Sequence, residues 1–551
     1  MSTKNQNNKK EKKESLIIGA LTGAAGIFIT KVLGLIYVSP LNAMAQGETA
    51  FYSYAYTVYD YALTVTMSGV PYAIATLVAE YMAKDDKATV LLVKKLSKML
   101  VSLMGVSICA LMIIFSKYLA LGVLPTNLTD MSYVDKTQAV IIIISFAMIT
   151  VPILGFYRGY YQGLKDMKVY AFTQVIEQAV RVGFLLAAGA ICVYLLNMER
   201  IWAVYMAVAS AAISAAVCII YFYFYDKRCS KEMQLDDVGE STHSKKEIFK
   251  ELISYAVPYL LGGLINNASG VINLFFTKNG YVKFGYPAEY IVTITGLVNF
   301  ECGKLVSIPQ IIATSFGLAI IPHIAEAYAQ NDEQKVNDLI AKALKTVFYL
   351  SILTNFWMCI FGTEIYYLMY GDYELSLGAN LLKAMLISYL LWVPIVVMGP
   401  IIVTQGKKKS YVIIGIVSLI LDVFTLPFWV SRLGKDGYFI NLILNWLITA
   451  AIMVYVIKKS SSFDMKSVFV TIGQSLIAVI PMLILKVILV ALNIQGFGNG
   501  RLSTLIYLFV CGVVCVGEYV FVTSKFKLPQ QLLGLELSKQ GIKNFISNLK
   551  G

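Results

Sequence analysis

The chain has 551 residues, of which 58% are hydrophobic and only 14% are charged. A soluble protein of this length folds as several domains with charged surfaces, and this sequence has too little charge to cover them. A formal net charge of +13 would favour nucleic-acid binding in a soluble protein. Here the basic residues gather in alternate loops between apolar runs, so no nucleic-acid partner is expected.

Apolar runs long enough to cross a hydrocarbon core of about 30 Å recur along the whole chain. They predict an all-α, polytopic (multi-pass) membrane protein with fourteen transmembrane helices. Most of the 46 lysines and arginines fall on the side of the two termini, which places both termini in the cytoplasm. The predicted spans are residues 15–38, 51–81, 92–116, 138–160, 169–196, 202–225, 251–277, 291–325, 339–362, 379–405, 411–431, 438–457, 467–492 and 502–523.

Two sequence echoes indicate an internal duplication. "VPILGFYRGYYQG" at 151–163 ends the fourth span, and "VPIVVMGPIIVTQG" at 393–406 ends the tenth. Ala79-Glu80 closes the second span as Ala325-Glu326 closes the eighth, at nearly the same offset. Each copy holds six helices, and six is even, so the copies have the same orientation and predict a pseudo-two-fold axis along the membrane normal.

The duplication and the polar loops together predict six segments. Mixed charge marks a linker between the lobes, and apolar residues at helical spacing mark an amphipathic tail near anionic lipid. The segments are a basic N-terminus (1–14), an N-lobe (15–225), a cytoplasmic linker (226–250), a C-lobe (251–457), two further helices (467–523) and a cytoplasmic tail (524–551).

Charged residues within the spans are the candidate functional residues, because a charge inside the bilayer normally faces protein or a wet cavity. Lys31 has no acid within a turn or two and borders a stripe of small residues, so it lies either in a packed face or at a cavity. Tyr56 and Asp60 continue a tyrosine stripe that belongs either to an interfacial belt or to a polar lumen. Glu177 and Arg181 are four residues apart and can pair, structurally or within a binding site.

The C-lobe offers a similar but sparser set. Glu301 and Lys304 are three residues apart on the eighth span, and Asp422 lies within the eleventh. The sequence lacks a phosphate-binding loop, its eight cysteines have no metal spacing, and its short outer loops contain no histidine. An enzyme, a metal site and an ATP-driven pump are therefore disfavoured.

Residues 155–183, "GFYRGYYQGLKDMKVYAFTQVIEQAVRVG", resemble a signature of the polysaccharide-flippase branch of the MOP superfamily. The shared elements are R-G-x-x-Q-G and then a helix with E-Q-x-x-R. Fourteen spans built as six, six and two resemble the MurJ-type lipid II flippases and the stage V sporulation-type proteins of Gram-positive bacteria.

The resemblance implies a V-shaped transporter in the bacterial cell membrane, with a cationic cavity between its lobes and a lipid-tail groove formed by the last two helices. It implies pyrophosphate contacts from Lys31 on the first helix and Lys304 on the eighth. It also implies a coupling cation at Asp422, assisted by Asn273 or Asn266, with Na⁺, H⁺ or the membrane potential alone as the driving force. No other cofactor is expected.

The expected function is translocation of undecaprenyl-pyrophosphate-linked peptidoglycan precursor (lipid II) to the outer leaflet by alternating access. The expected substrate-binding residues are Lys31, Lys304, Asp60, Tyr56, Arg181, Glu177 and Glu301. The expected partners are the polyprenyl-pyrophosphate-linked sugar, membrane lipids and the cell-wall synthesis machinery. The alternatives are a flippase for another lipid-linked glycan, such as teichuronic acid, capsule or spore cortex, a cation-coupled multidrug exporter of the same superfamily, and a membrane enzyme of glycan assembly.

Overall fold

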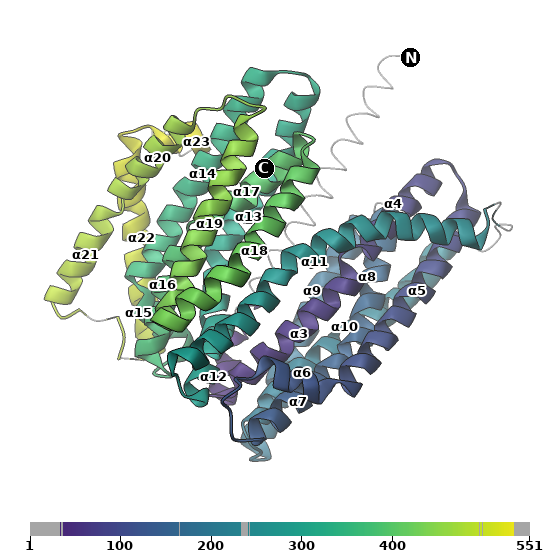
Figure 1. Ribbon diagram of the computed structural model, residues 1–551, viewed down its shortest axis with the longest axis horizontal. Coiled ribbons are helices and arrows are strands. Elements are labelled where there is room, and N and C mark those ends of the chain that lie inside the picture. The colour runs from purple at the N-terminus through teal and green to yellow at the C-terminus, as the bar shows by residue number, and fades with distance from the viewer. Residues whose placement is uncertain are drawn as a thin grey trace. The chain divides into compact units, whose positions relative to one another are not determined.

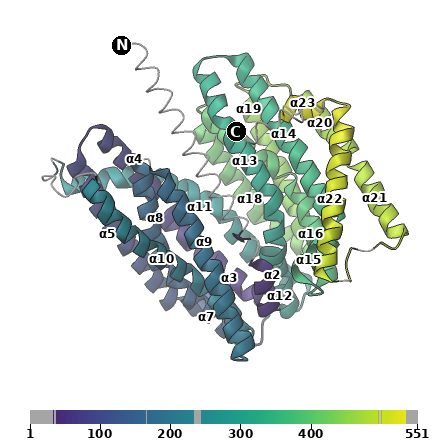
Figure 2. The same cartoon turned by 180° about the vertical axis from the view of Figure 1, so that it is seen from behind.

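The computed structural model describes residues 33–34, 37–164, 166–232, 241, 243–494, 496–498 and 500–533. In this part of the chain every regular element is a helix, and no strand occurs (Figures 1 and 2). The helices group into two compact units. The first contains residues up to Lys278 and Pro287–Gly296, and the second contains Asn279–Tyr286 and everything from Leu297 onward.

The first unit is a bundle in which α8 packs against α4, α5 and α10. Most of the connections between these helices are only a few residues long. Its elements are α2 (Val38–Ala45), α3 (Thr49–Met67), α4 (Val70–Ala83), α5 (Lys87–Ile114), α6 (Ser116–Val123), α7 (Ser132–Ser145), α8 (Ala147–Gly163), α9 (Met167–Ala190), η1 (Ile191–Leu195), α10 (Ile201–Glu232), most of α11 (Lys245–Phe284) and α12 (Ala288–Gly296).

The second unit has an apolar core to which α13, α14, α17, α19 and α20 contribute. Its elements are η2 (Leu297–Cys302), α13 (Gly303–Ala329), α14 (Glu333–Ile360), α15 (Gly362–Tyr370), α16 (Leu375–Tyr389), α17 (Val393–Thr404), α18 (Lys408–Leu433), α19 (Lys435–Lys458), α20 (Met465–Ile477), α21 (Ile480–Ala491), α22 (Arg501–Ser524) and α23 (Leu528–Leu533).

Twelve stretches within the described residues are long and apolar enough to cross a membrane, and each corresponds to a predicted span. The predicted first span, 15–38, lies almost wholly outside the described residues. The predicted seventh span, 251–277, is helical as part of α11, but α11 is not among the twelve. The all-helical, multi-pass architecture is confirmed, and the total of fourteen spans stays a prediction.

The predicted internal repeat is visible in the helix boundaries. Helices α5 and α14 each have 28 residues and start at Lys87 and Glu333, an offset of 246. The preceding turns match as well: Asp85 and Asn331 have φ of 57° and 54°. Asp86 and Asp332 then cap the two helices through the backbone N–H groups three residues on. The same turn therefore precedes the same helix in both units.

Helix α11 packs against the first unit, which also contains α12, and both helices extend beyond the predicted linker. Asn267 donates to the Thr64 hydroxyl over 2.5 Å, and the Tyr81 hydroxyl donates to Glu251 over 2.8 Å. The buried Lys278 ammonium donates to the carbonyl oxygens of Gly122 and Leu124, at the end of α6. These contacts fix α11 along most of its length.

Candidate functional site: an arginine–glutamate ladder and an acidic pocket

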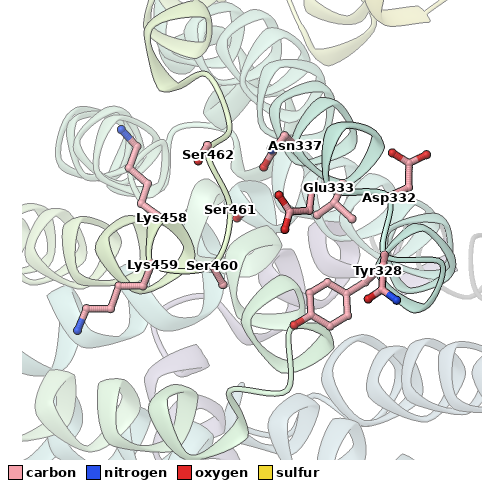
Figure 3. A pocket seen from close by; sticks show the side chains of 11 residues that line it. Tyr328, Asp332, Glu333, Asn337, Lys458, Lys459, Ser460, Ser461 and Ser462 are labelled. Atoms are coloured by element: carbon pink, nitrogen blue, oxygen red, sulfur yellow. The ribbon is translucent and has the colours of Figure 1, made fainter.

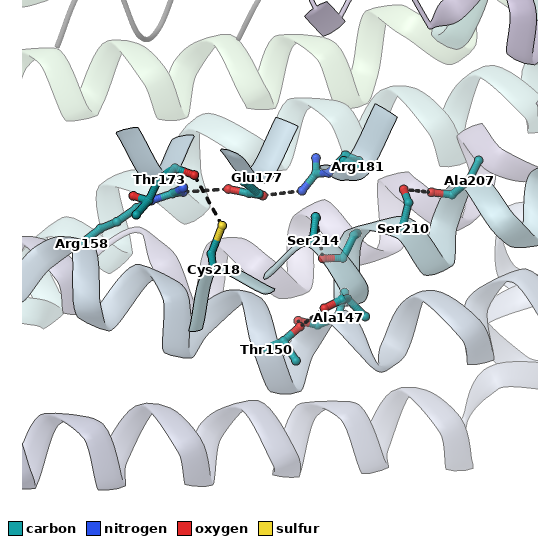
Figure 4. A network of polar contacts seen from close by, with 12 residues as sticks. Ala147, Thr150, Arg158, Thr173, Glu177, Arg181, Ala207, Ser210, Ser214 and Cys218 are labelled. Atoms are coloured by element: carbon teal, nitrogen blue, oxygen red, sulfur yellow. Dashed lines mark hydrogen bonds and ion pairs between the residues drawn. The ribbon is translucent and has the colours of Figure 1, made fainter. Parts of the chain in front are cut away.

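Three charged side chains form a ladder between α8 and α9 in the first unit. Arg158 Nη1 lies 2.9 Å from Glu177 Oε2, and Arg181 Nη2 lies 2.6 Å from Glu177 Oε1 (Figure 4). All three lie within membrane-spanning stretches, and their side chains are 15%, 14% and 24% exposed in the order Arg158, Glu177, Arg181. One carboxylate thus serves two guanidinium groups, and the ladder keeps one uncompensated positive charge.

The ladder also has unused hydrogen-bond donors. Arg158 Nη2 and Arg181 Nε are buried and have no hydrogen-bond partner among the described residues. Arg158 Nε donates to the Thr173 hydroxyl over 3.5 Å, and the Cys218 thiol approaches the Thr173 carbonyl oxygen from α10 (Figure 4). Buried donors that carry positive charge favour an anionic acceptor such as a phosphate oxygen.

A row of tyrosines on α3 lies next to the ladder. The Tyr52 and Tyr56 rings are stacked with centroids 5.3 Å apart, and the Tyr56 and Tyr59 centroids are 5.5 Å apart. All three rings are close enough to Arg181 to interact electrostatically with its guanidinium group. The predicted candidate Tyr56 therefore shares one neighbourhood with Arg181 and Glu177.

Glycines place Arg158 by letting α8 approach α4 closely. Gly155, Gly159 and Gly163 recur every four residues on one face of α8, where added Cβ atoms would meet α4 or the end of α3. At Gly159 such a Cβ would lie 2.6 Å from the Pro71 carbonyl oxygen. Small residues at this spacing allow close helix contact in membranes. Of the two Gln-Gly pairs in the sequence echo, Gly163 is still helical, whereas Gly406 has a φ of 77° and forms a turn.

Replacing Gly159 with alanine is expected to destabilise the first unit, because the new methyl group meets backbone atoms that cannot move aside. Overpacking of this kind costs about 1–3 kcal/mol. A lower melting temperature of the detergent-solubilised protein measures the effect. Gly183→Ala is the matched control, since a Cβ there meets nothing within 4 Å. Equal melting temperatures for the two variants would contradict the packing role.

Asp60 lines a hollow of about 390 Å³ within the first unit. Its side chain is exposed, and the hollow lies beside the break between α3 and α4. The Thr64 hydroxyl donates to the Asp60 carbonyl oxygen over 2.8 Å and accepts a hydrogen bond from Asn267. The other lining residues are Leu63, Met67, Ser68, Tyr72 and Gly263.

The second unit has a buried polar cluster between α18 and α19. Asn441 Nδ2 donates to Asp422 Oδ1 over 2.9 Å, and the Thr425 hydroxyl donates to Asn441 Oδ1 over 2.6 Å. One turn away, Asn445 Oδ1 accepts hydrogen bonds from the hydroxyls of Ser418 and Thr449. The structure thus gives Asp422 a partner on the next helix of its own unit.

The family described as "Polysaccharide biosynthesis protein" matches residues 18–328, and the family described as "Lipid II flippase MurJ" matches residues 229–509. The chain belongs to these families. It is accordingly a multi-pass protein of the bacterial cell membrane.

Individual members of the family are distant in sequence. The Lipid II flippase MurJ of Bacillus subtilis (strain 168) is 26% identical over 95% of this chain and 97% of its own length. Stage V sporulation protein B of the same organism is 23% identical over 69% of this chain and 71% of its own length.

Solved structures of the superfamily share the fold. A Lipid II flippase MurJ in an inward closed conformation has a TM-score of 0.66 at 12% identity and covers 93% of this chain and 100% of its own. An inward-facing multidrug resistance MATE family transporter has a TM-score of 0.62 at 14% identity and covers 79% of this chain and 96% of its own.

The predicted site residues of this family member fall into different places. Glu177, Arg181 and Tyr56 come together in the first unit, and the predicted Glu177–Arg181 ion pair is confirmed. Glu301 is fully buried in η2, and Lys304 is half-buried on α13. The binding roles of all these residues stay predictions.

The remaining predicted site residues are Lys31, Asn266, Asn273 and Asp422. Lys31 lies outside the described residues, as does the side chain of Asn266. Asn273 lies on α11 in the first unit, whereas Asp422 belongs to the second. The Asn273 side-chain oxygen is buried and has no hydrogen-bond partner among the described residues.

The ladder contains one residue that is not among the predicted site residues. Arg158 is half-buried and paired with Glu177. A signal was present in the family signature itself, since R-G-x-x-Q-G and E-Q-x-x-R end and begin neighbouring helices. An arginine on one such helix can reach a glutamate on the other.

A second hollow, of about 420 Å³, lies in the second unit between the turn before α14 and the segment after α19 (Figure 3). The Glu333 carboxylate and the Asn337 amide point towards the serines at 460–462, while the Lys458 and Lys459 side chains point away (Figure 3). The Gln405 side chain bonds to the hydroxyls of Ser460 and Ser461. The charged residues that line this hollow are Asp332, Glu333, Lys458 and Lys459, and it lies at the ends of spanning helices.

One further ion pair joins the C-terminal helices to the rest of the second unit. The Lys486 ammonium on α21 contacts Glu364 Oε1 on α15. The Glu364 side chain is only 2% exposed, and Lys486 also lies 5.1 Å from the Phe361 ring centroid. The pair therefore fixes α21 against the body of the unit.

Proposed function

We propose that this protein is a flippase that moves lipid II from the inner to the outer leaflet by alternating access. Membership of the polysaccharide biosynthesis and MurJ families supports transport of a lipid-linked glycan. The Bacillus subtilis relative named Lipid II flippase MurJ, which aligns over nearly its whole length, supports lipid II as the cargo.

The observation that carries the proposal is the net positive Arg158–Glu177–Arg181 ladder at membrane depth. A pyrophosphate that leaves water has to exchange its hydration for cationic donors, because an unpaired ion in a low dielectric is costly. The ladder offers two buried unused donors and one excess positive charge. Lys31 and Lys304 are proposed as additional phosphate contacts, each acting as a point charge.

Arginine replacement in a strain depleted of its lipid II flippase tests this proposal. Arg158→Gln and Arg181→Gln keep polar side chains but remove the positive charge, so each is expected to abolish complementation. Arg200→Gln is the matched control, because Arg200 is exposed and its guanidinium donates to the Ala43 carbonyl oxygen over 3.3 Å. Full complementation by both ladder variants at equal membrane levels would refute the proposal.

The alternative cargo is another lipid-linked glycan, such as a spore-cortex precursor. The similarity to stage V sporulation protein B supports this alternative. Depletion of the protein followed by identification of the lipid-linked intermediate that accumulates on the inner face separates the two. Accumulation of lipid II supports the first cargo, and accumulation of a different lipid-linked glycan supports the second.

The Asp422 cluster is proposed as the site of a coupling cation. Its carboxylate, amide and hydroxyl oxygens are ligands that Na⁺ accepts, and a carboxylate also accepts a proton. Asp422→Asn is expected to slow transport in proteoliposomes and to remove its dependence on a Na⁺ or H⁺ gradient. Transport by the unaltered protein that responds to membrane potential alone would contradict this assignment.

A further inference from the structure

Asp60 provides a negative charge beside the positive ladder. It lies eleven residues into the 35-residue membrane-spanning stretch Thr49–Ala83, or roughly 16 Å along a helix axis from its start. Its side chain is exposed into the hollow beside the α3–α4 break. An ionisable group at that depth normally faces a wet cavity or a ligand, because exposure to lipid is costly.

The walls of this hollow leave the carboxylate without a cation. Its lining contains hydroxyls from Thr64, Ser68 and Tyr72 and no lysine or arginine. The nearest polar group on α11, the Asn267 amide, donates to Thr64. No ion pair to Asp60 occurs within the described part of the chain. Among the described residues, the Asp60 carboxylate therefore has no cationic partner in this hollow.

The acidic hollow and the arginine ladder flank the same aromatic row. Tyr56 precedes Asp60 by four residues, so the two lie on the same face of α3, about one 5.4 Å turn apart. Tyr59 lies near Arg181, Glu177 and Asp60. Opposite charges at the two sides of one row match a ligand headgroup that itself has both charges.

We infer that the Asp60 hollow binds a primary ammonium group on the same cargo headgroup whose phosphate is held by the ladder. An ammonium has three donors, which match the Asp60 carboxylate and the neighbouring hydroxyl oxygens. At about 390 Å³ the hollow admits an alkylammonium chain, whereas a bare metal ion takes several oxygen ligands at 2–3 Å. The cargo is then a lipid-linked glycopeptide with a free amine, not a glycan that has only hydroxyls. This inference rests on the proposed function.

Two synthetic lipids test the inference on the full-length protein in nanodiscs. Each has a polyprenyl pyrophosphate, a disaccharide and a short peptide, and they differ only in whether the peptide's side-chain amine is free or acetylated. The unaltered protein is expected to bind the free amine at least roughly tenfold more tightly. Asp60→Asn is expected to remove this preference by weakening the free-amine lipid alone. Asp130→Asn, in an outer loop, is the matched control and is expected to keep the preference.

Three results would contradict the inference, and a fourth would contradict the proposed function. Equal binding of the two lipids by the unaltered protein would overturn the inference and leave the proposed function intact. A preference that survives Asp60→Asn would assign the amine to another residue and overturn it as well. An Asp60→Asn effect that is equal for both lipids and disappears when N-methyl-D-glucamine replaces Na⁺ would show a solution cation instead. Failure of the unaltered protein to bind either lipid would count against the proposed function itself.

Discussion

Glu177→Ala is expected to leave too little folded protein to purify in normal yield. The substitution leaves two half-buried guanidinium groups, Arg158 and Arg181, without their shared carboxylate. Removing one partner of a buried ion pair costs about 3–5 kcal/mol, and here the same carboxylate serves two partners. The melting temperature of the solubilised protein and its size-exclusion profile measure the loss.

A triple variant separates stability from function at this site. Replacing Arg158 and Arg181 with methionine and Glu177 with leucine removes all three charges at similar volume, and such replacements are often neutral for stability. We expect the melting temperature to recover and complementation to stay absent. A triple variant that also complements would show that the ladder is only structural.

Lys486→Met is expected to have the second large effect. It leaves the Glu364 carboxylate, only 2% exposed, without its cation, at a similar cost of about 3–5 kcal/mol. Because the pair joins α21 to α15, the helices α20–α22 should loosen from the second unit. Limited proteolysis in the segment between α21 and α22 reports this loosening together with the melting temperature.

Two further variants make this expectation specific to the pair. The double variant Lys486→Met with Glu364→Leu removes both charges and is expected to recover most of the lost stability. Lys525→Met is the matched control, because Lys525 at the end of α22 is exposed and contacts the Phe521 ring. Equal proteolysis of the Lys486 and Lys525 variants would contradict the anchoring role.

The spans were predictable because a membrane demands long apolar helices, whatever they pack against. One break within them has a local signal, because Gly69 precedes α4 and Pro71 lies in its first turn. The π-helical turn η2 has no such signal, because it depends on neighbouring helices. The ion pair of Glu177 with Arg181 was predictable from a four-residue spacing on one helix, whereas Arg158 required knowledge that α8 and α9 meet.

The polar cluster around Asp422 also depends on contacts between two helices, which the local sequence does not show. Asn441 of α19 donates a hydrogen bond to Asp422, and the role of Asn266 or Asn273 in binding a coupling cation stays a prediction. Helices α18 and α19 are joined by a single residue, Gly434, and so pack as a hairpin. Asn441, Asn445 and Thr449 recur every four residues on an otherwise apolar helix, a pattern that pointed to this face.

The shared turn and 28-residue helix of the two units bear on how the protein arose. In a symmetric dimer of identical chains every substitution occurs twice. Once two copies are fused, each position can change alone. At the offset of the Gln-Gly pairs, the second-half counterparts of Arg158, Glu177 and Arg181 are the apolar residues Ile401, Ile420 and Phe424. Fusion thus allowed one half to have three charged residues at positions where the other half has apolar ones.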